Sequence, residues 1–446
     1  MTRVIDLSSI EKKIKNSDLL TYTGKVSEVT GLMIESVGPI ARMGEVCLIY
    51  PTDGVSEPIR TEVVGFSGNK LVLMPLGHVN GIAQGCTVVA TNHTFRVPVA
   101  EELVGRILDG LGQPIDNKGP IAPTDYYGID NDPPDPLMRE RITKVLPLGI
   151  KAIDGLLTCG QGQRLGIFAG SGVGKSTLLG MIARNAVADL NVITLVGERG
   201  REVRDFIEKD LKEEGLRKSV LIIATSDQPA LVRVKAAMLG TSIAEYFRDK
   251  GKNVLFLMDS LTRFAMAQRE VGMASGEPPV SRGYTPSVFA MLPRLLERTG
   301  NSSKGSITGL YTVLVDGDDL NEPISDTVRG ILDGHIVLSR KLANRNHYPA
   351  IDVLASVSRV MPDIVTREHY DIANTIKSKM AVYKDAEDLI NIGAYKKGAN
   401  QDIDEAILLN KPIEGFLRQR VEEAHGFDKT VDMMREILRI GAGSQV

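Results

Sequence analysis

The fold of this chain is decided by one stretch, Ala169-Gly170-Ser171-Gly172-Val173-Gly174-Lys175-Ser176-Thr177. An apolar run at 164–168 precedes it and is typical of a buried strand. A run typical of a helix, at 178–183, follows it. Strand, glycine-rich loop and helix, in this order, are the required context of a phosphate-binding loop. The stretch therefore predicts a P-loop nucleotide-binding fold.

The residue types of this loop suit a nucleoside triphosphate. Glycine lets consecutive backbone N–H groups turn inward around phosphate oxygens, and the following helix N-terminus adds the positive end of its dipole. Lys175 is expected to reach the β- and γ-phosphates, and the Ser176 hydroxyl to bind Mg²⁺. Ala169 stands where the motif has glycine, which matters only if that position needs a positive φ. We predict that all of 169–177 contacts nucleotide.

Composition excludes several classes of protein. The 446 residues include 53 Lys+Arg and 56 Asp+Glu, a net charge of −3, so no global basic field draws the chain onto nucleic acid. Cys47, Cys86 and Cys159 are far apart, which argues against a disulfide framework and favours a reducing cytoplasm. The histidine spacing predicts no metal site. No signal peptide and no run of about 18 apolar residues is present, so we expect no membrane span.

Two acidic residues follow apolar strand candidates. The run 254–258 ends in Asp259, and the run 194–197 ends in Glu198. A P-loop hydrolase needs a carboxylate on the Mg²⁺ side and a group that orients or deprotonates water, so these two residues are candidates for the two roles. The alternatives are that Asp259 caps the next helix and that Glu198 forms an ordinary ion pair with Arg199 or Arg201.

The pattern along the chain changes twice. Residues 19–94 hold short strands with glycine-rich turns, including a hairpin at Ser67–Lys70, and predict a small β-barrel. From about 145, strands alternate with helices, as in a parallel α/β sheet. The strands expected there span 164–169, 192–196, 220–225, 254–258, 306–315, 335–339 and 353–355. Helices are expected between them, such as 176–188, 201–214 and 230–249, whereas the segment 114–136, rich in Pro, Asp and Gly, is expected to be a loop. From about 367 the pattern is helical.

The first residues read as an amphipathic helix. Ser8 and Glu11 have capping-box spacing, and Leu7, Ile10 and Ile14 fall on one face. Such a helix either packs on its own domain or docks a partner. Together with the two changes of pattern, this predicts four parts. They are a docking segment at 1–18, a barrel at 19–94, an ATPase core at 95–366 and a helical domain at 367–446.

Several motifs resemble the catalytic subunits of rotary ATPases. Gly197–Glu202 resembles their GERxRE segment, Ala244–Asp249 looks like a second shared segment, and Pro349–Ser358 fits the F-type α/β signature. The resemblance covers about 20–446. Within that superfamily, 168–176 and Gly276–Pro279 look most like the flagellum-specific ATPases of the type III export apparatus, with the injectisome ATPases as near relatives. This implies a RecA-like α/β core, an N-terminal barrel and a C-terminal helical domain.

The resemblance also implies residue roles. Glu198 matches the catalytic carboxylate, where non-catalytic subunits usually have Gln, and Asp259 matches the Walker B aspartate. Arg199 matches a phosphate-side arginine, and Arg263 a neighbouring site residue. Glu202 belongs to the matched GERxRE segment and is counted with the site.

Two further residues of the family's site come from other motifs. Arg359 matches the arginine finger that one subunit inserts into the site of its neighbour, and Tyr348 matches an adenine-stacking tyrosine. The second aromatic of the adenine pocket is not identified, because the chain has Lys411-Pro412-Ile413 where the family often has an aromatic. A finger acting in trans implies a homohexameric ring with one site at each interface.

By resemblance, the chain is expected to hydrolyse ATP with Mg²⁺ and to energise export of flagellar proteins. The implied partners are a regulator on the N-terminal helix, a central coiled-coil stalk, the membrane export gate and chaperone–substrate complexes. No nucleic-acid partner is expected. The implied location is cytoplasmic, peripheral to the export apparatus of the inner membrane.

Other functions remain as alternatives. They are an injectisome ATPase, a rotary ATP synthase catalytic subunit, a hexameric RNA or DNA motor and a non-enzymatic scaffold. The nucleic-acid motor is disfavoured, because the first 94 residues have few aromatics beyond Tyr22, Tyr50 and Phe66 and no basic run. The scaffold is disfavoured because the catalytic residues are complete.

Overall fold

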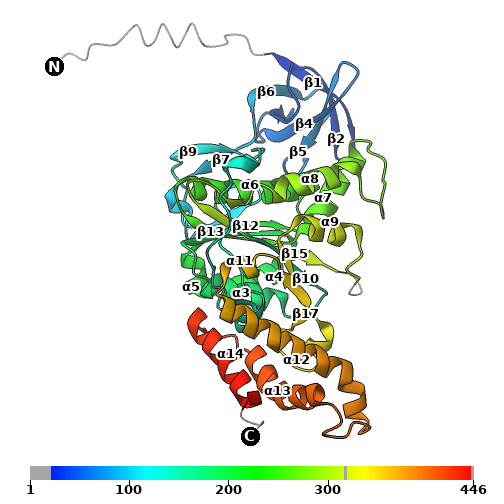
Figure 1. Ribbon diagram of the computed structural model, residues 1–446. Helices are drawn as coiled ribbons and strands as arrows, with labels where there is room; N and C mark the ends of the chain where they lie inside the picture. Colours follow the sequence, from blue (N-terminus) through cyan, green and yellow to red (C-terminus); the bar gives the residue numbers. More distant parts are fainter. Residues whose placement is uncertain (1–21, 316–318, 443–446) are drawn as a thin grey trace, which may run out of the picture. The chain divides into compact units, whose positions relative to one another are not determined.

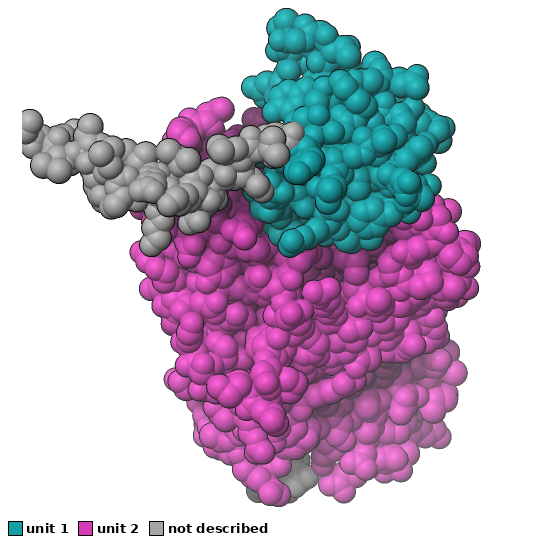
Figure 2. Space-filling model, turned by 90° about the horizontal axis from the view of Figure 1, so that it is seen from above, with its two compact units in different colours: residues 1–95 teal, residues 96–446 magenta. Residues whose placement is uncertain are grey.

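The computed structural model describes residues 22–315 and 319–442 (Figure 1). These residues fall into two compact units, divided between Phe95 and Arg96 (Figure 2). The predicted docking segment at 1–18 lies outside the described residues. The predicted helical domain lies in the same unit as the α/β sheet. The four-part division of the chain stays a prediction.

The first unit contains a closed barrel, in the order β1-β2-β5-β4-β3-β6. Its strands are β1 (Thr23–Thr30), β2 (Met33–Val37), β3 (Glu45–Tyr50), β4 (Ile59–Ser67), β5 (Lys70–Pro75) and β6 (Thr87–Thr94). Alternate residues such as Ile34, Ile49 and Leu73 fill its interior. The predicted hairpin is confirmed, since Ser67 pairs with Lys70. β3 was not predicted from the sequence.

The second unit is built on a mostly parallel sheet, in the order β17-β16-β10-β15-β13-β11-β12-β8. Its strands are β8 (Ile107–Asp109), β10 (Arg164–Ala169), β11 (Leu190–Glu198), β12 (Ser219–Thr225), β13 (Asn253–Asp259), β15 (Ser306–Leu314), β16 (Gly334–Leu338) and β17 (Ile351–Ser358). β14 (Gly300–Asn301) pairs with β15, while β7 (Arg96–Val99) and β9 (Asp125–Gly128) form a separate pair. The central strands β11 and β13 are buried along almost their whole length and are mostly apolar, because helices cover both faces of the sheet.

Helices cover this sheet and, after β17, follow one another as far as Ala442. They are α2 (Lys151–Leu156), α3 (Lys175–Asn185), α4 (Gly200–Asp205), the π-helical turn η3 (Phe206–Leu211), α5 (Lys212–Arg217), α6 (Ala230–Asp249), α7 (Leu261–Ala274), α8 (Pro286–Leu296), α9 (Pro323–Ile331), α10 (Arg340–Asn344), α11 (Met361–Ile364), α12 (Arg367–Asn391), α13 (Gln401–Leu417) and α14 (Phe427–Ala442). The 3-10 turns η1 (Glu101–Leu103) and η2 (Pro136–Met138) complete the set. Figure 1 shows α6, α7 and α8 on one side of the sheet and α3 and α5 on the other. The predicted helical C-terminal region is confirmed.

Three expectations need correction. The sheet is not wholly parallel, because β17 runs antiparallel to β16. The segment 114–136, expected as loop, contains β9. The helix expected at 201–214 is broken into α4, η3 and α5, with Lys212 at a positive φ. Each difference depends on packing between distant segments, which local patterns do not report.

The segment Ala244–Asp249, which resembles a segment of the rotary ATPases, has a structural role. Glu245, in α6, accepts hydrogen bonds from Arg298 Nε and Nη2, both at 2.8 Å. Arg298 also donates to Ile129 O at 2.6 Å, and Asn131 donates to Glu245 at 2.7 Å. Both charged side chains are almost fully buried. This network fastens α6 to the chain beyond α8.

Removing one partner should therefore destabilise the second unit. Glu245→Ala leaves the Arg298 charge buried and unpaired, a change that costs about 3–5 kcal/mol. Urea denaturation followed by circular dichroism measures the loss. Asp132→Ala is the matched control, because its ion pair with Arg294 is exposed and worth at most about 1 kcal/mol. Equal effects of the two changes would contradict the structural role of Glu245.

Candidate functional site

The predicted phosphate-binding loop connects β10 to α3. Gly172 and Gly174 have φ angles of 77° and 84°, in the left-handed region that favours glycine. Ala169 is the last residue of β10 and pairs with Leu314, so its backbone is extended. Alanine at the first motif position therefore introduces no backbone strain.

Three predicted site residues converge beside this loop. Lys175 begins α3, Glu198 ends β11 and Asp259 ends β13, so the carboxyl ends of neighbouring parallel strands bring them to one edge of the sheet. Lys175 Nζ lies 2.5 Å from Asp259 Oδ1 and 3.4 Å from Glu198 Oε1. Their side chains are only 5–12% exposed. Two carboxylates thus hold the lysine where phosphates are expected.

The charges of this cluster shift two pKa values. Burial lowers the pKa of Lys175, but Asp259 and Glu198 more than offset it, so the net shift is upward and the ammonium persists. Burial and the negative charge of Asp259 raise the pKa of Glu198, and a hydrogen bond with Glu202 raises it further, against the opposing effect of Lys175. A carboxylate with a raised pKa is a better proton acceptor near neutral pH.

Arg263 joins the same cluster from α7. Its guanidinium donates to the carbonyl of Gly197 and lies 3.6 Å from Glu198 Oε2. A Cβ on Gly197 would approach Arg263 Cδ to 2.9 Å, and Gly197 has a φ of 72°. Gly197 is thus required for the close packing of Arg263. This role was not predicted from the sequence, where Gly197 stood only as the first residue of the Gly197–Glu202 segment.

Arg199 and Glu202 lie farther out. Arg199 is 74% exposed and pairs with Glu202 at 3.3 Å. Glu198 does not form the ordinary pair with Arg199 or Arg201 considered as an alternative, since its partners are Lys175 and Arg263. In this structure the predicted phosphate-side arginine therefore points to Glu202.

Tyr348 lies against the phosphate-binding loop, because a Cβ on Gly174 would be 3.3 Å from its ring. The tyrosine is 41% exposed, which leaves ring surface available for stacking. Its carbonyl accepts a hydrogen bond from the backbone of Gln419. Residues 411–413 lie inside α13, where Ile413 is buried in the core.

Arg359 is not part of this cluster. It follows β17, and its backbone N–H donates to Asp333 O at 3.0 Å, while the backbone N–H of Asp333 donates to Arg164 O. Arg164 starts β10, whereas the loop follows the end of that strand. At about 3.3 Å per residue, the strand separates these ends by roughly 17 Å. The chain's own Arg359 therefore lies at the opposite edge of the sheet from Lys175.

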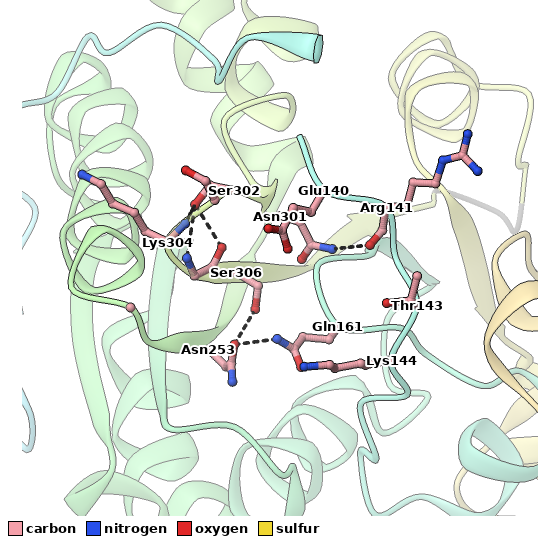
Figure 3. A pocket seen from close by; sticks show the side chains of 13 residues that line it. Glu140, Arg141, Thr143, Lys144, Gln161, Asn253, Asn301, Ser302, Lys304 and Ser306 are labelled. Carbon is pink, nitrogen blue, oxygen red and sulfur yellow. Dashed lines mark hydrogen bonds between the residues drawn. The ribbon is translucent and has the colours of Figure 1, made fainter. Parts of the chain in front are cut away.

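A polar pocket of about 220 Å³ also lies at that opposite edge (Figure 3). Asn253 Oδ1 accepts hydrogen bonds there from Gln161 at 2.6 Å and Ser306 at 3.0 Å. Arg141 and Lys304 extend away from its centre in Figure 3. The pocket contains none of the predicted site residues.

The donor set at the loop fits Mg²⁺ rather than a metal held in a protein cage. Within 22–315 and 319–442, no group of three or more His, Cys, Asp or Glu side chains could hold a metal ion. Mg²⁺ in phosphate sites takes few protein ligands and keeps water and phosphate oxygens. The Ser176 hydroxyl and the Asp259 carboxylate are suitable oxygen ligands of this kind.

Among the described helices, none is long and apolar enough to cross a membrane.

Three family models each match a different part of the chain. The beta-barrel domain of the ATP synthase alpha/beta family matches residues 26–92, and the nucleotide-binding domain of that family matches 149–358. The C-terminal domain of the T3SS EscN ATPase matches 365–436.

Similar proteins include a "Flagellum-specific ATP synthase" of Bacillus subtilis, 56% identical over 92% of this chain and 94% of that protein. A "Type 3 secretion system ATPase" of Xanthomonas euvesicatoria is 48% identical over 96% and 97%. Among solved structures, assembled EscN of enteropathogenic E. coli, also seen in complex with its central stalk EscO, has a TM-score of 0.87 and 47% identity, over 93% of this chain and 100% of that one.

The raised pKa of Glu198 predicts the pH dependence of hydrolysis. If Glu198 accepts the proton of the attacking water, it must be ionised, so kcat/KM should fall as the pH drops through a value above about 4.3, the ordinary pKa of glutamate. Glu202→Ala removes a hydrogen bond that raises this pKa, so the fall should move to lower pH. Steady-state rates across pH, with circular dichroism at each pH, measure the shift.

Glu208→Ala is the control for this change, because Glu208 forms an exposed pair with Arg204. The assignment of Glu198 as the proton acceptor would be contradicted if the fall in kcat/KM shifts by the same amount in both variants. It would also be contradicted if the fall shifts to higher pH in Glu202→Ala.

Proposed function

The chain belongs to the family of flagellum-specific and type 3 secretion system ATPases, and from this premise we propose that its ATP hydrolysis energises the export of flagellar proteins. The observation that carries the catalytic part is the contact of Lys175 with both Asp259 and Glu198 beside the phosphate-binding loop. The flagellum-specific relative has the higher identity of the two relatives compared above, which favours the flagellar system.

The mechanism begins with an exchange of partners at Lys175. The ammonium leaves the two carboxylates and binds the β- and γ-phosphates, together with the backbone N–H groups of 170–174 and the start of α3. Ser176 and Asp259 would hold Mg²⁺, which would supply positive charge against the phosphate oxygens. Glu198 orients the attacking water and accepts its proton, while Arg263 keeps that carboxylate in place.

Arg359 completes the site from a neighbouring subunit. Its place at the far edge of the sheet supports this proposal, because the distance is too great for a side chain to span within one chain. A closed ring of identical subunits provides one such interface for each site. We therefore propose a homohexamer whose sites need Lys175 from one subunit and Arg359 from the next.

The remaining nucleotide contacts are proposed from position. Tyr348 stacks on adenine, since its half-exposed ring lies beside Gly174. Arg199 turns from Glu202 toward the phosphates when nucleotide binds. Its high exposure leaves it free to reorient.

The proposed partners follow the family. They are a central stalk protein in the ring, a regulator on residues 1–18, the membrane export gate and chaperone–substrate complexes. The proposed location is cytoplasmic, peripheral to the export apparatus. An injectisome ATPase is the second candidate, favoured by the similarity to EscN. Deletion of the gene, followed by assays of flagellin export and of effector secretion, separates the two.

Glu198→Gln should bind ATP but hydrolyse it at least about a hundredfold more slowly, because the amide cannot accept a proton from water. Single-turnover hydrolysis measures the loss, and equilibrium binding of a fluorescent ATP analogue checks that the site is intact. Turnover near that of the unmodified protein, in an assembled ring, would refute the role of Glu198.

Arg359 offers a test of shared sites. Lys175→Ala and Arg359→Ala should each be inactive alone, whereas a mixture should regain part of the activity, since some interfaces then combine an intact loop with an intact arginine. ATPase rates of mixed rings measure this recovery. Arg345→Ala, which removes an exposed arginine paired with Glu387, should leave activity almost unchanged. Verified mixed rings without recovery would exclude the trans arrangement.

A further inference from the structure

A buried threonine contacts the predicted Walker B carboxylate. Thr312 lies in β15 and is fully buried between β10 and β13: it pairs with Ile167, and the preceding Tyr311 pairs with Met258. Its hydroxyl donates to Asp259 Oδ1 at 2.7 Å. The other acceptor near this hydroxyl, Met258 O, is at 3.4 Å. Because a hydroxyl has one proton, the shorter bond to Asp259 is the stronger one.

The same carboxylate oxygen also accepts from Lys175 Nζ at 2.5 Å. Both donors therefore reach Oδ1, one from the strand beside β13 and one from the phosphate-binding loop. The two donors differ in mobility. Lys175 is a flexible side chain that moves to the phosphates when nucleotide binds, whereas Thr312 is β-branched and fixed within the sheet.

Burying a hydroxyl at this position costs free energy, whereas burying a hydrocarbon group there would not. Valine has nearly the same shape as threonine, suits a buried strand as well, and avoids burying a polar group. The hydroxyl of Thr312 is compensated by the carboxylate, in a charge-assisted hydrogen bond. Its place is thus explained by Asp259 rather than by the packing of β15.

We propose that Thr312 is a positioning residue that holds the Asp259 carboxylate in one orientation throughout the ATPase cycle. When Lys175 leaves for the phosphates, Thr312 stays on Oδ1, and Oδ2 is the oxygen left for Mg²⁺ or its bound water. This inference rests on the proposed Mg²⁺ role of Asp259. Residues that orient a metal ligand typically contribute 10- to 100-fold in metal affinity or activity.

The test compares nucleotide binding with and without Mg²⁺. The affinity for the fluorescent analogue mant-ADP is measured in excess Mg²⁺ and in EDTA. The ratio of the first affinity to the second is the Mg²⁺ gain. Thr312→Val should leave the affinity in EDTA unchanged and reduce the Mg²⁺ gain by about tenfold or more. Thr312→Ser, which keeps the hydroxyl, should retain most of the gain. ATPase titrations should show a parallel rise in the Mg²⁺ concentration needed for half-maximal rate.

Thr308→Val is the matched control. Thr308 is also buried in β15, but its hydroxyl accepts from the backbone of Gly162, away from Asp259. The Mg²⁺ gain should be unchanged in this variant. If Thr312→Val does not fold, as judged by thermal unfolding, Thr312→Ala takes its place with the same expected loss.

The variant Asp259→Asn distinguishes the positioning role of Thr312 from the Mg²⁺ role of Asp259 on which it rests. If this change abolishes the Mg²⁺ gain while Thr312→Val and Thr312→Ala keep it, the positioning role of Thr312 is wrong and the role of Asp259 stands. If Asp259→Asn itself keeps the gain, the assignment of Asp259 to Mg²⁺ fails, and the inference fails with it.

Discussion

The contact of Lys175 with Asp259 and Glu198 is the interaction on which the site depends. Three charges are removed from water in one place, which is costly unless they compensate one another. The two carboxylates keep the ammonium charged and in place, and the ammonium offsets part of their repulsion. A nucleotide can replace the carboxylates as the partner of Lys175, because phosphates bring the same sign of charge.

The sheet explains why these groups meet. Parallel strands end at one edge, so β10, β11 and β13 deliver the loop, Glu198 and Asp259 to neighbouring positions. β17 runs antiparallel to its neighbour β16, so it ends at the opposite edge and carries Arg359 there. The reversal of this strand thus separates Arg359 from Lys175, Glu198 and Asp259 of its own chain.

Several features could be predicted from local sequence. The loop at 169–177, the hairpin at Ser67–Lys70 and the C-terminal helices follow from residue types and spacing over short distances. β3 and β9 were not predicted, since β3 is held by β6 as well as by β4, and β9 pairs with β7, which lies well before it in the chain. Glu245 stood in a family-like segment, but only its buried pair with Arg298 explains its place in the structure.

The sequence alone therefore determined the fold class, the phosphate-binding loop and the two carboxylates at strand ends. These features depend on neighbours in the chain and on the rule that parallel strands end together. Only the tertiary structure decided that Glu198 pairs with Lys175 and Arg263 instead of Arg199, that Arg359 lies far from the loop, and that Thr312 contacts Asp259. The physical reason is that these contacts join strands and helices separated by tens to hundreds of residues, and their geometry depends on sheet order and register.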